Sequence, residues 1–239
     1  MTGAVAHAAL ALAASRPQLS LVAQPARVQL DGPGSQTVIV ANRGSAPVVL
    51  DVQRAGFALD LRGRPRIVPA ARAAWLSVKP KRVAIQPGEA AALAVTGRVL
   101  HGAAPGDHAS LLLLASRPLS TTAVAVRVRL GVVVVLRVPG RIVHRLKVLG
   151  VRASRVGAKR VLTVRFANRG NVAELLGREN ASVTLWRRGR LLARLPVAPR
   201  ELLPRSRGVV EVAYRGPARG RVVCRIGVKL PGPRFRLKL

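Results

Sequence analysis

The sequence predicts an all-β protein of two tandem antiparallel β-sandwich domains. Short apolar runs with strand character recur along the 239 residues, separated by turns rich in Gly, Pro, Asn and Asp, while helical periodicity is almost absent. The motif Ala-Asn-Arg-Gly occurs twice, ending at Gly44 and at Gly170, each time after an alternating apolar run. Hydrophobic residues make up 49% of the chain and aromatic residues only 3%, so we expect two aliphatic cores.

Strands of this length and spacing are typical of a sandwich. In the first half we expect strands at 26–30, 37–42, 47–52, 73–80, 82–85, 91–99, 108–116 and 122–138. In the second half we expect them within 145–154, 160–168, 182–195, 202–216, 219–230 and 234–239, with a hairpin that turns at Arg188-Gly189.

The run 122–138 has two different patterns. Apolar residues alternate from Val124 to Leu130, which indicates one buried face. After Gly131 the run is continuously apolar, as in a strand covered on both faces. Because Pro139 ends this strand, we place the domain boundary at Pro139-Gly140. The expected domains are therefore 18–138 and 141–239, joined by the linker 139–140.

Further matched segments support a repeat. "IQPGEAAALAV", from Ile85, corresponds to "LLPRSRGVVEV", from Leu202, and "PGDHASLLLL" corresponds to "RGRVVCRIGV". The offset between copies shrinks along the chain, so the first copy contains extra residues, which we place in 56–75. We expect Asn42 and Asn168 to occupy equivalent corners, where each side chain bonds its own loop backbone; the alternative is a ligand-binding asparagine.

The N-terminal segment 1–17 is an Ala- and Leu-rich apolar stretch. Its small-x-small sequence at Ala11-Leu12-Ala13 favours a signal peptide cut short at its basic end, and the alternative is a simple N-terminal helix. Elsewhere no segment is long enough to span a bilayer, since Gly131–Val138 is too short. We therefore expect an exported protein of the cell envelope or the extracellular space.

The charge is strongly positive, with 41 basic and nine acidic residues and a net charge of +32. Residues 140–239 contribute +21 of this excess, so the second half should attract anionic polymers. The candidate anion-binding residues lie in one expected hairpin: Arg187, Arg188, Arg190 and Arg194. The alternative is an arginine coat that is merely solvated. Nucleic acid is disfavoured as a partner because few aromatic residues are free to stack on bases.

No catalytic, metal or cofactor site is expected. The only carboxylates close in sequence are Glu174 and Glu179, in an expected loop, and the four histidines lack ligand spacing. Asp107-His108 could form half of a triad, but a Pro-Gly-Asp turn is the simpler interpretation. Cys224 alternates with apolar residues and is expected in a core. We conclude that the chain is not an enzyme.

Three segments resemble a known group of proteins: "QTVIVANRGSAPVVLDV", "WLSVKPKRVAIQPGEAAALAV" and "APGDHASLLLL". They resemble bacterial immunoglobulin-like envelope domains, in particular the surface proteins with a peptidoglycan-binding domain that interact with WxL proteins. A looser similarity links them to periplasmic pilus chaperones. The glycine signature of the WxL-interacting proteins is reduced here to Gly102 and Gly106. Pilus chaperones hold a client carboxylate with a basic pair, to which neither Arg27 nor Arg127 is assigned.

These observations favour a non-enzymatic, exported binding or scaffolding protein made of two immunoglobulin-like sandwiches. Its partner would be an anionic cell-wall polymer or another envelope protein. One alternative is a chaperone-like protein that lends a strand to secreted surface subunits. A second alternative is a nucleic-acid binder, which the arginine content permits.

Overall fold

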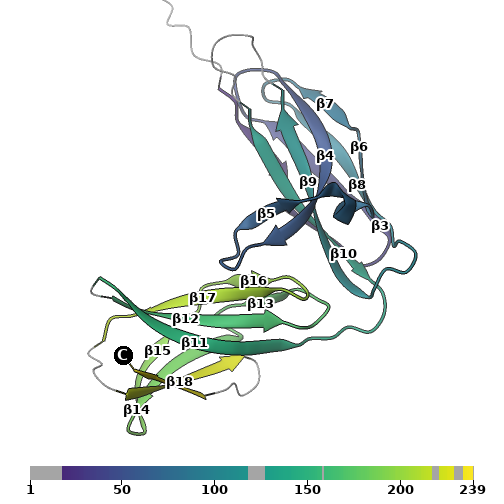
Figure 1. Ribbon diagram of the computed structural model, residues 1–239. Helices are drawn as coiled ribbons and strands as arrows, with labels where there is room; N and C mark the ends of the chain where they lie inside the picture. The colour runs from purple at the N-terminus through teal and green to yellow at the C-terminus, as the bar shows by residue number, and fades with distance from the viewer. Residues whose placement is uncertain (1–17, 118–126, 158, 217–220, 229–233, 239) are drawn as a thin grey trace, which may run out of the picture.

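The computed structural model describes residues 18–117, 127–157, 159–216, 221–228 and 234–238. Strands form nearly all of its regular structure, in two domains that meet at a bend (Figure 1). The strands of the first domain lie within Leu21–Val138 and those of the second within Leu146–Lys238, and residues 139–145 join the two. This architecture confirms the prediction of an all-β protein with two antiparallel sandwiches.

Ten strands and one short 3-10 helix, η1, form the first domain. One sheet has the order β1-β3-β8-β6, and the other has the order β2-β10-β9-β4-β5, with β7 also paired to β4. All pairings in these two sheets are antiparallel except that of β2 with β10, which is parallel. The elements are β1 (Leu21–Gln24), β2 (Arg27–Leu30), β3 (Gly34–Asn42), β4 (Val48–Leu59), β5 (Pro65–Val68), η1 (Ala70–Ala73), β6 (Leu76–Lys79), β7 (Arg82–Ile85), β8 (Ala90–Gly97), β9 (Gly106–Ser116) and β10 (Arg129–Val138).

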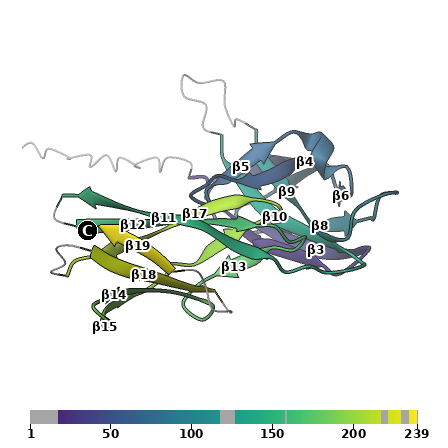
Figure 2. The same cartoon turned by 60° about the horizontal axis from the view of Figure 1, so that its bottom comes forward.

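The second domain has the same kind of layering. Figure 2 shows β11, β12 and β17 in one layer and β14, β15, β18 and β19 in the other, and β13 pairs with β16 at one end. The strands are β11 (Leu146–Val156), β12 (Lys159–Asn168), β13 (Glu174–Leu176), β14 (Ala181–Arg187), β15 (Arg190–Leu195), β16 (Arg200–Leu202), β17 (Arg207–Tyr214), β18 (Arg221–Val228) and β19 (Arg234–Lys238). Glu174 therefore begins a strand, and its expected place in a loop was wrong.

Each sandwich encloses an aliphatic core, because strand residues point alternately to the two faces of a sheet. In β3, Val38 and Val40 are buried and Ile39 between them is exposed. The first core also contains Trp75, and the second contains Phe166 and Tyr214, so aromatic residues add to both aliphatic cores.

The Asn corner of the first domain is closed by its buried asparagine. Asn42 is fully buried and donates from Nδ2 to the carbonyl oxygens of Ala46 (2.8 Å) and Ile85 (3.1 Å). Its Oδ1 accepts a hydrogen bond from the Gly44 amide at 3.0 Å. The side chain thereby ties the turn to a neighbouring strand and leaves no amide hydrogen for a ligand.

The second domain repeats this corner bond for bond. Asn168 donates to the carbonyl oxygens of Val172 (2.7 Å) and Leu202 (3.0 Å), and it accepts from the Gly170 amide at 2.9 Å. Ile85 and Leu202, the first residues of the two segments matched by sequence, thus accept equivalent bonds. The repeat and the structural role of both asparagines are confirmed.

The two patterns in the last strand of the first domain have different causes. Val132, Val134 and Leu136 of β10 face the first core. On the other face, Val133 packs against a small cluster that includes Leu203 of the second domain. The continuous apolar run is thus covered on one face by the sandwich and on the other by the domain contact. The alternating run is described only from residue 127, so Val124 and Val126 lie outside the described residues.

The N-terminal segment 1–17 also lies outside the described residues, and the expectation of a signal peptide there stays a prediction. In the part of the chain that the structure describes, no helix is long and apolar enough to cross a membrane.

Candidate functional site

The edge of β10 is only partly paired. On one side, β9 pairs with it along its whole length, from Arg129 to Val138. On the other side, β2 pairs with Val133–Leu136 alone. Within the described residues, 129–132 therefore have no strand partner on that side, and the second sheet of the first domain ends there in an open edge.

This open edge exists because the N-terminal strand changes sheets. β1 pairs with β3 in the first sheet, and after Pro25 the chain continues as β2 in the second sheet. Among the described residues, the start of β10 therefore has no neighbouring strand on the side away from β9. Leu21, Ala23 and Leu130 pack against the core at this place and remain only half-buried.

Backbone direction along β10 shows which groups face the open edge. The Val133 amide donates to the Ala26 carbonyl oxygen at 3.1 Å, on the side of β2. In an extended strand the N–H and C=O groups of every second residue point to the same side. Gly131 and Arg129 therefore present their N–H and C=O groups to the open edge, where a further strand could pair with them.

The second feature is the junction between the domains, which is centred on Asp107 at the start of β9. Its carboxylate is 3% exposed and binds Arg137 through two contacts, Nε–Oδ1 at 2.8 Å and Nη2–Oδ2 at 3.1 Å. The same carboxylate accepts the Ala173 amide of the second domain at 2.8 Å. The hydrogen bond to Asp107 raises the pKa of Arg137 further above its ordinary value.

Asn171 completes this junction from the second domain. Its backbone carbonyl accepts the Asp107 amide at 2.8 Å, and its side chain donates to the carbonyl oxygens of Pro105 (2.9 Å) and Arg141 (2.8 Å). Gly106 lies directly against it with φ of +116°, and a Cβ there would overlap the Asn171 carbonyl. Only glycine satisfies both the backbone angle and the close approach.

A second contact between the domains comes from the β4–β5 hairpin. The Leu61 carbonyl oxygen at its tip accepts the Val209 amide of β17 at 2.7 Å. Oδ1 of Asp60 accepts hydrogen bonds from the backbone amides of Arg62 (2.8 Å) and Arg64 (2.9 Å), which closes the turn. These bonds, mainly that from Arg64, hold the pKa of Asp60 below its ordinary value. This hairpin lies within 56–75, the segment where sequence placed the extra residues.

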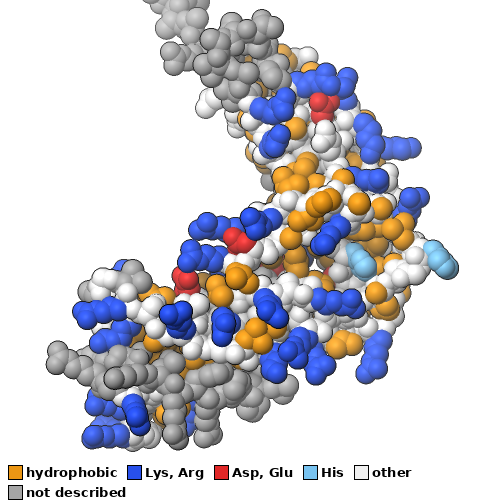
Figure 3. All heavy atoms as spheres, viewed as in Figure 1, with side chains coloured by type: hydrophobic (Ala, Val, Ile, Leu, Met, Phe, Trp, Pro, Cys, Tyr) orange, Lys and Arg blue, Asp and Glu red, His pale blue; other side chains and the backbone are white. Residues whose placement is uncertain are grey.

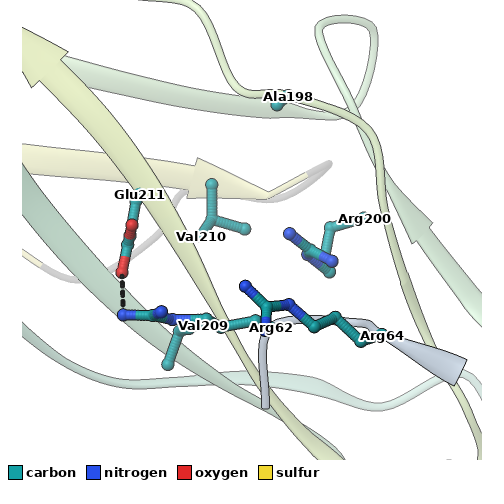
Figure 4. A pocket seen from close by; sticks show the side chains of 7 residues that line it. All are labelled: Arg62, Arg64, Ala198, Arg200, Val209, Val210 and Glu211. Carbon is teal, nitrogen blue, oxygen red and sulfur yellow. Dashed lines mark hydrogen bonds and ion pairs between the residues drawn. The ribbon is translucent and has the colours of Figure 1, made fainter. Parts of the chain in front are cut away.

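Beside this tip the two domains enclose a hollow of about 310 Å³ (Figure 4). Arg62 and Arg64 border it from the first domain and Arg200 from the second, and Glu211 lies at its edge. Arg62 pairs with Glu211 at 3.5 Å. Another cross-domain pair, between Arg27 of β2 and Glu201 at 2.9 Å, involves the residue next to Arg200.

The four arginines singled out by sequence lie on the β14–β15 hairpin. Arg188 and Gly189 form its turn with φ of 46° and 76°, as a two-residue hairpin requires. Arg188, Arg190 and Arg194 are exposed and Arg187 is half-buried. No ion pair joins any of the four to a carboxylate among the described residues. Their binding role stays a prediction.

The remaining Cys, His and acidic residues considered in the sequence analysis make contacts that stabilise the fold and form no catalytic or metal site among the described residues. Cys224 is fully buried, and burial raises the pKa of its thiol to about 11. Nδ1 of His144 lies 2.8 Å from the Glu174 carboxylate. Asp107 binds Arg137, whereas Nε2 of His108 lies 2.8 Å from the Ala104 carbonyl oxygen, so they form no half-triad. Over the described ranges, no three His, Cys, Asp or Glu side chains gather as metal ligands would.

Sequence reasoning missed both cross-domain features. Arg62, Arg64 and Arg200 carry no local motif, and Asp107 was interpreted as part of a turn. The one available signal was the extra segment 56–75, because an insertion in one copy of a repeat adds a surface that the other copy lacks.

No protein-family model and no curated protein matches this sequence. Among solved structures, the chain is similar to the YadV chaperone, with a TM-score of 0.52 and 15% identity over 91% of this chain and 99% of that one. It is similar to the class 5 fimbriae chaperone CfaA, with a TM-score of 0.52 and 10% identity over 92% of this chain and 98% of that one. A third match is the CsuC–CsuE chaperone–tip adhesion subunit complex of Acinetobacter baumannii Csu pili, with a TM-score of 0.50 and 12% identity over 91% and 97% of the two chains.

These matches cover nearly the full length of both chains at low identity, so they establish the fold. They confirm the prediction of two immunoglobulin-like sandwiches and support the looser similarity to pilus chaperones. They do not show the narrower resemblance to WxL-interacting proteins. The chain therefore has the two-domain, immunoglobulin-like fold of the pilus chaperones.

Proposed function

We propose that this protein is a non-enzymatic, chaperone-like protein of the cell envelope that binds a β-strand of an exported subunit along the open edge of β10. The observation that carries the proposal is the stretch 129–132, which among the described residues has no strand partner on the side away from β9 and is bordered by half-buried apolar side chains. The similar structures support it, because two of them are chaperones and a third is a complex of a chaperone with a tip adhesion subunit. The chaperone-like alternative is thus favoured over wall binding.

Strand addition supplies both parts of the binding energy. Main-chain hydrogen bonds to Arg129 and Gly131 would give affinity, and apolar side chains that alternate along the partner would give register. Val128 and Leu130 are half-buried in the free chain. A partner strand that covered them fully would add roughly 25 cal/mol for each Å² of apolar surface removed from water.

Gly131 offers a matched pair of variants for testing this edge. Gly131→Pro removes the edge-facing N–H and leaves the hydrogen bonds of β10 with β9 intact, because those come from the alternate residues. Gly131→Ala keeps the N–H, and its Cβ would meet only Leu111 and Leu113 at 3.6 and 3.9 Å, which is ordinary contact. The two variants therefore differ in one edge donor.

The partner would be captured by placing a photo-crosslinking residue at the exposed position 129 in producing cells and identified by mass spectrometry. Overlapping peptides of that partner would then be tested for binding to the purified protein. One extended peptide should bind the wild type and Gly131→Ala, protect the amides of residues 129 and 131 from hydrogen exchange, and bind Gly131→Pro at least about tenfold more weakly. Equal binding to all three proteins, or protection elsewhere, would refute the proposal.

The basic hairpin favours a second candidate function, the binding of an anionic wall polymer. Its support is the exposure of Arg188, Arg190 and Arg194 without carboxylate partners among the described residues. Replacing Arg187, Arg188 and Arg190 together by Ala should reduce retention on purified cell wall far more than any single replacement, and salt should do the same. If the folded triple variant were retained on cell wall as well as the wild type, the arginines of this hairpin would be solvated surface residues without a binding role.

A further inference from the structure

Three arginines from two domains surround one hollow, and this concentration of charge is the feature that the proposed function does not use. Arg62 and Arg64 flank the tip of the β4–β5 hairpin, while Arg200 begins β16 in the second domain. Figure 4 shows their guanidinium groups around the same space. Figure 3 shows that Lys and Arg side chains are common on this face of the molecule and that Asp and Glu side chains are few.

The position of Arg200 is built into the fold. A Cβ on Gly63 would overlap Nη1 of Arg200, and Gly63 has φ of +77°. The guanidinium of Arg200 therefore rests against the backbone of the hairpin tip at Gly63, which lies between Arg62 and Arg64 in the chain. The tip itself is fixed by Asp60 and by the Leu61–Val209 hydrogen bond across the domains.

The charges in the hollow are not balanced. Among the described residues, the one ion pair of Glu211 is with Arg62 at 3.5 Å, and the side chains of Arg62 and Glu211 are 62% and 46% exposed, so this pair is loose. Nε of Arg200 is buried and has no hydrogen-bond partner among the described residues. Buried polar groups normally have a hydrogen-bond partner, so the N–H at this Nε is a donor that no protein group among the described residues uses. Three cations against one carboxylate leave a net charge of about +2 in a space that holds several non-hydrogen atoms.

We propose that this hollow is a binding site for a multivalent oxyanion, a phosphate or a polycarboxylate, which would join the two domains by contacting Arg64 and Arg200 together. Guanidinium groups present planar pairs of N–H donors that match the oxygen atoms of carboxylate and phosphate. Because the ligand would contact both domains, it would bind the docked arrangement and oppose their separation. This site is separate from the open edge of β10 and goes beyond the proposed function.

The test is isothermal titration calorimetry of the full chain at low ionic strength, with inorganic phosphate and with citrate as probes. We expect one site per chain, with affinity lowered about tenfold by Arg64→Gln and again by Arg200→Gln, which is the loss typical of a charge-assisted hydrogen bond. The matched control is Arg66→Gln, an exposed arginine of the same hairpin outside the hollow, which should change the affinity less than twofold. Whichever probe binds more tightly identifies the source as phosphate or carboxylate.

Three results would overturn the proposal: no one-to-one binding of either probe, several equivalent sites, or equal weakening by Arg64→Gln and Arg66→Gln. The last two would mean that the general positive surface attracts anions. Because Arg64 is exposed, its variant should fold even if Arg200→Gln disturbs the domain contact. The probes should also raise the unfolding temperature of the wild type and of Arg66→Gln, but not that of Arg64→Gln.

Discussion

Replacing the corner asparagine of either domain should cost that domain much of its stability. In Asn42→Ala, the carbonyl oxygens of Ala46 and Ile85 and the Gly44 amide lose their side-chain partner. Each hydrogen bond contributes about 1 kcal/mol net, and groups left without a partner in a buried site add to the loss. We expect the free energy of unfolding to fall by about 3–4 kcal/mol. Asn168→Ala should have a similar cost because its three bonds are the same.

The assay is urea unfolding followed by tryptophan fluorescence. The chain has two tryptophans, Trp75 in the first domain and Trp186 in the second, so Trp186→Phe and Trp75→Phe backgrounds report on one domain each. With a slope of about 1.5 kcal/mol per molar urea, the transition of the altered domain should move down by about 2 M. The control, Gln36→Ala, removes an exposed side chain of the same strand as Asn42 and should change the free energy by less than about 0.5 kcal/mol.

Two results would refute the reasoning about these corners. A loss below about 1 kcal/mol would mean that the corner bonds contribute little to stability. Costs that differ between Asn42→Ala and Asn168→Ala by much more than the usual context effects would contradict their equivalence. Since each domain has its own core, the transition of the unaltered domain should move much less.

Gly106→Ala should loosen the domain junction, because the new Cβ would clash with Asn171, and trypsin should then cleave faster after Arg141. The control is Gly32→Ala, where φ is similar at +112° and the Cβ would meet open space, so only the backbone should be strained. Equal cleavage rates for the two variants would contradict this prediction. Cys224 should react with iodoacetamide at pH 8 about a hundredfold more slowly in the folded protein than in urea, because its thiol has a pKa of about 11 and is buried; rapid alkylation without unfolding would show otherwise. Hydrogen bonds from Arg117 and then Arg82 lower the pKa of Asp51 below 3.8, so its contribution to stability is present above that pH and lost as the pH falls through the lowered value. Asp51→Asn should therefore weaken the acid dependence of unfolding, and an unchanged acid limb would contradict the ion pairs.

Local patterns in the sequence were sufficient for the fold class and for most of the strands, whereas β1, β5 and β13 were not expected. Alternation of apolar residues predicted the strands and their buried faces, and Arg188-Gly189 predicted a hairpin turn. The repeated Ala-Asn-Arg-Gly motif predicted equivalent corners, which the matched bonds of Asn42 and Asn168 confirm. These features depend on hydrogen bonds and steric limits between residues that are near in sequence or paired along neighbouring strands. Such local requirements leave a recognisable pattern in a single amino-acid sequence.

Tertiary structure decided the candidate sites. The open edge of β10 depends on where β2 stops pairing, and a sequence pattern does not show how far one strand covers another. Arg62 and Arg200 meet only because the hairpin tip docks on β17, and Val133 is covered only because Leu203 comes from the other domain. Such contacts follow from the docking of two domains that are each complete by themselves. Periodicity reports which face of a strand is buried, whereas domain docking determines which distant side chains meet there.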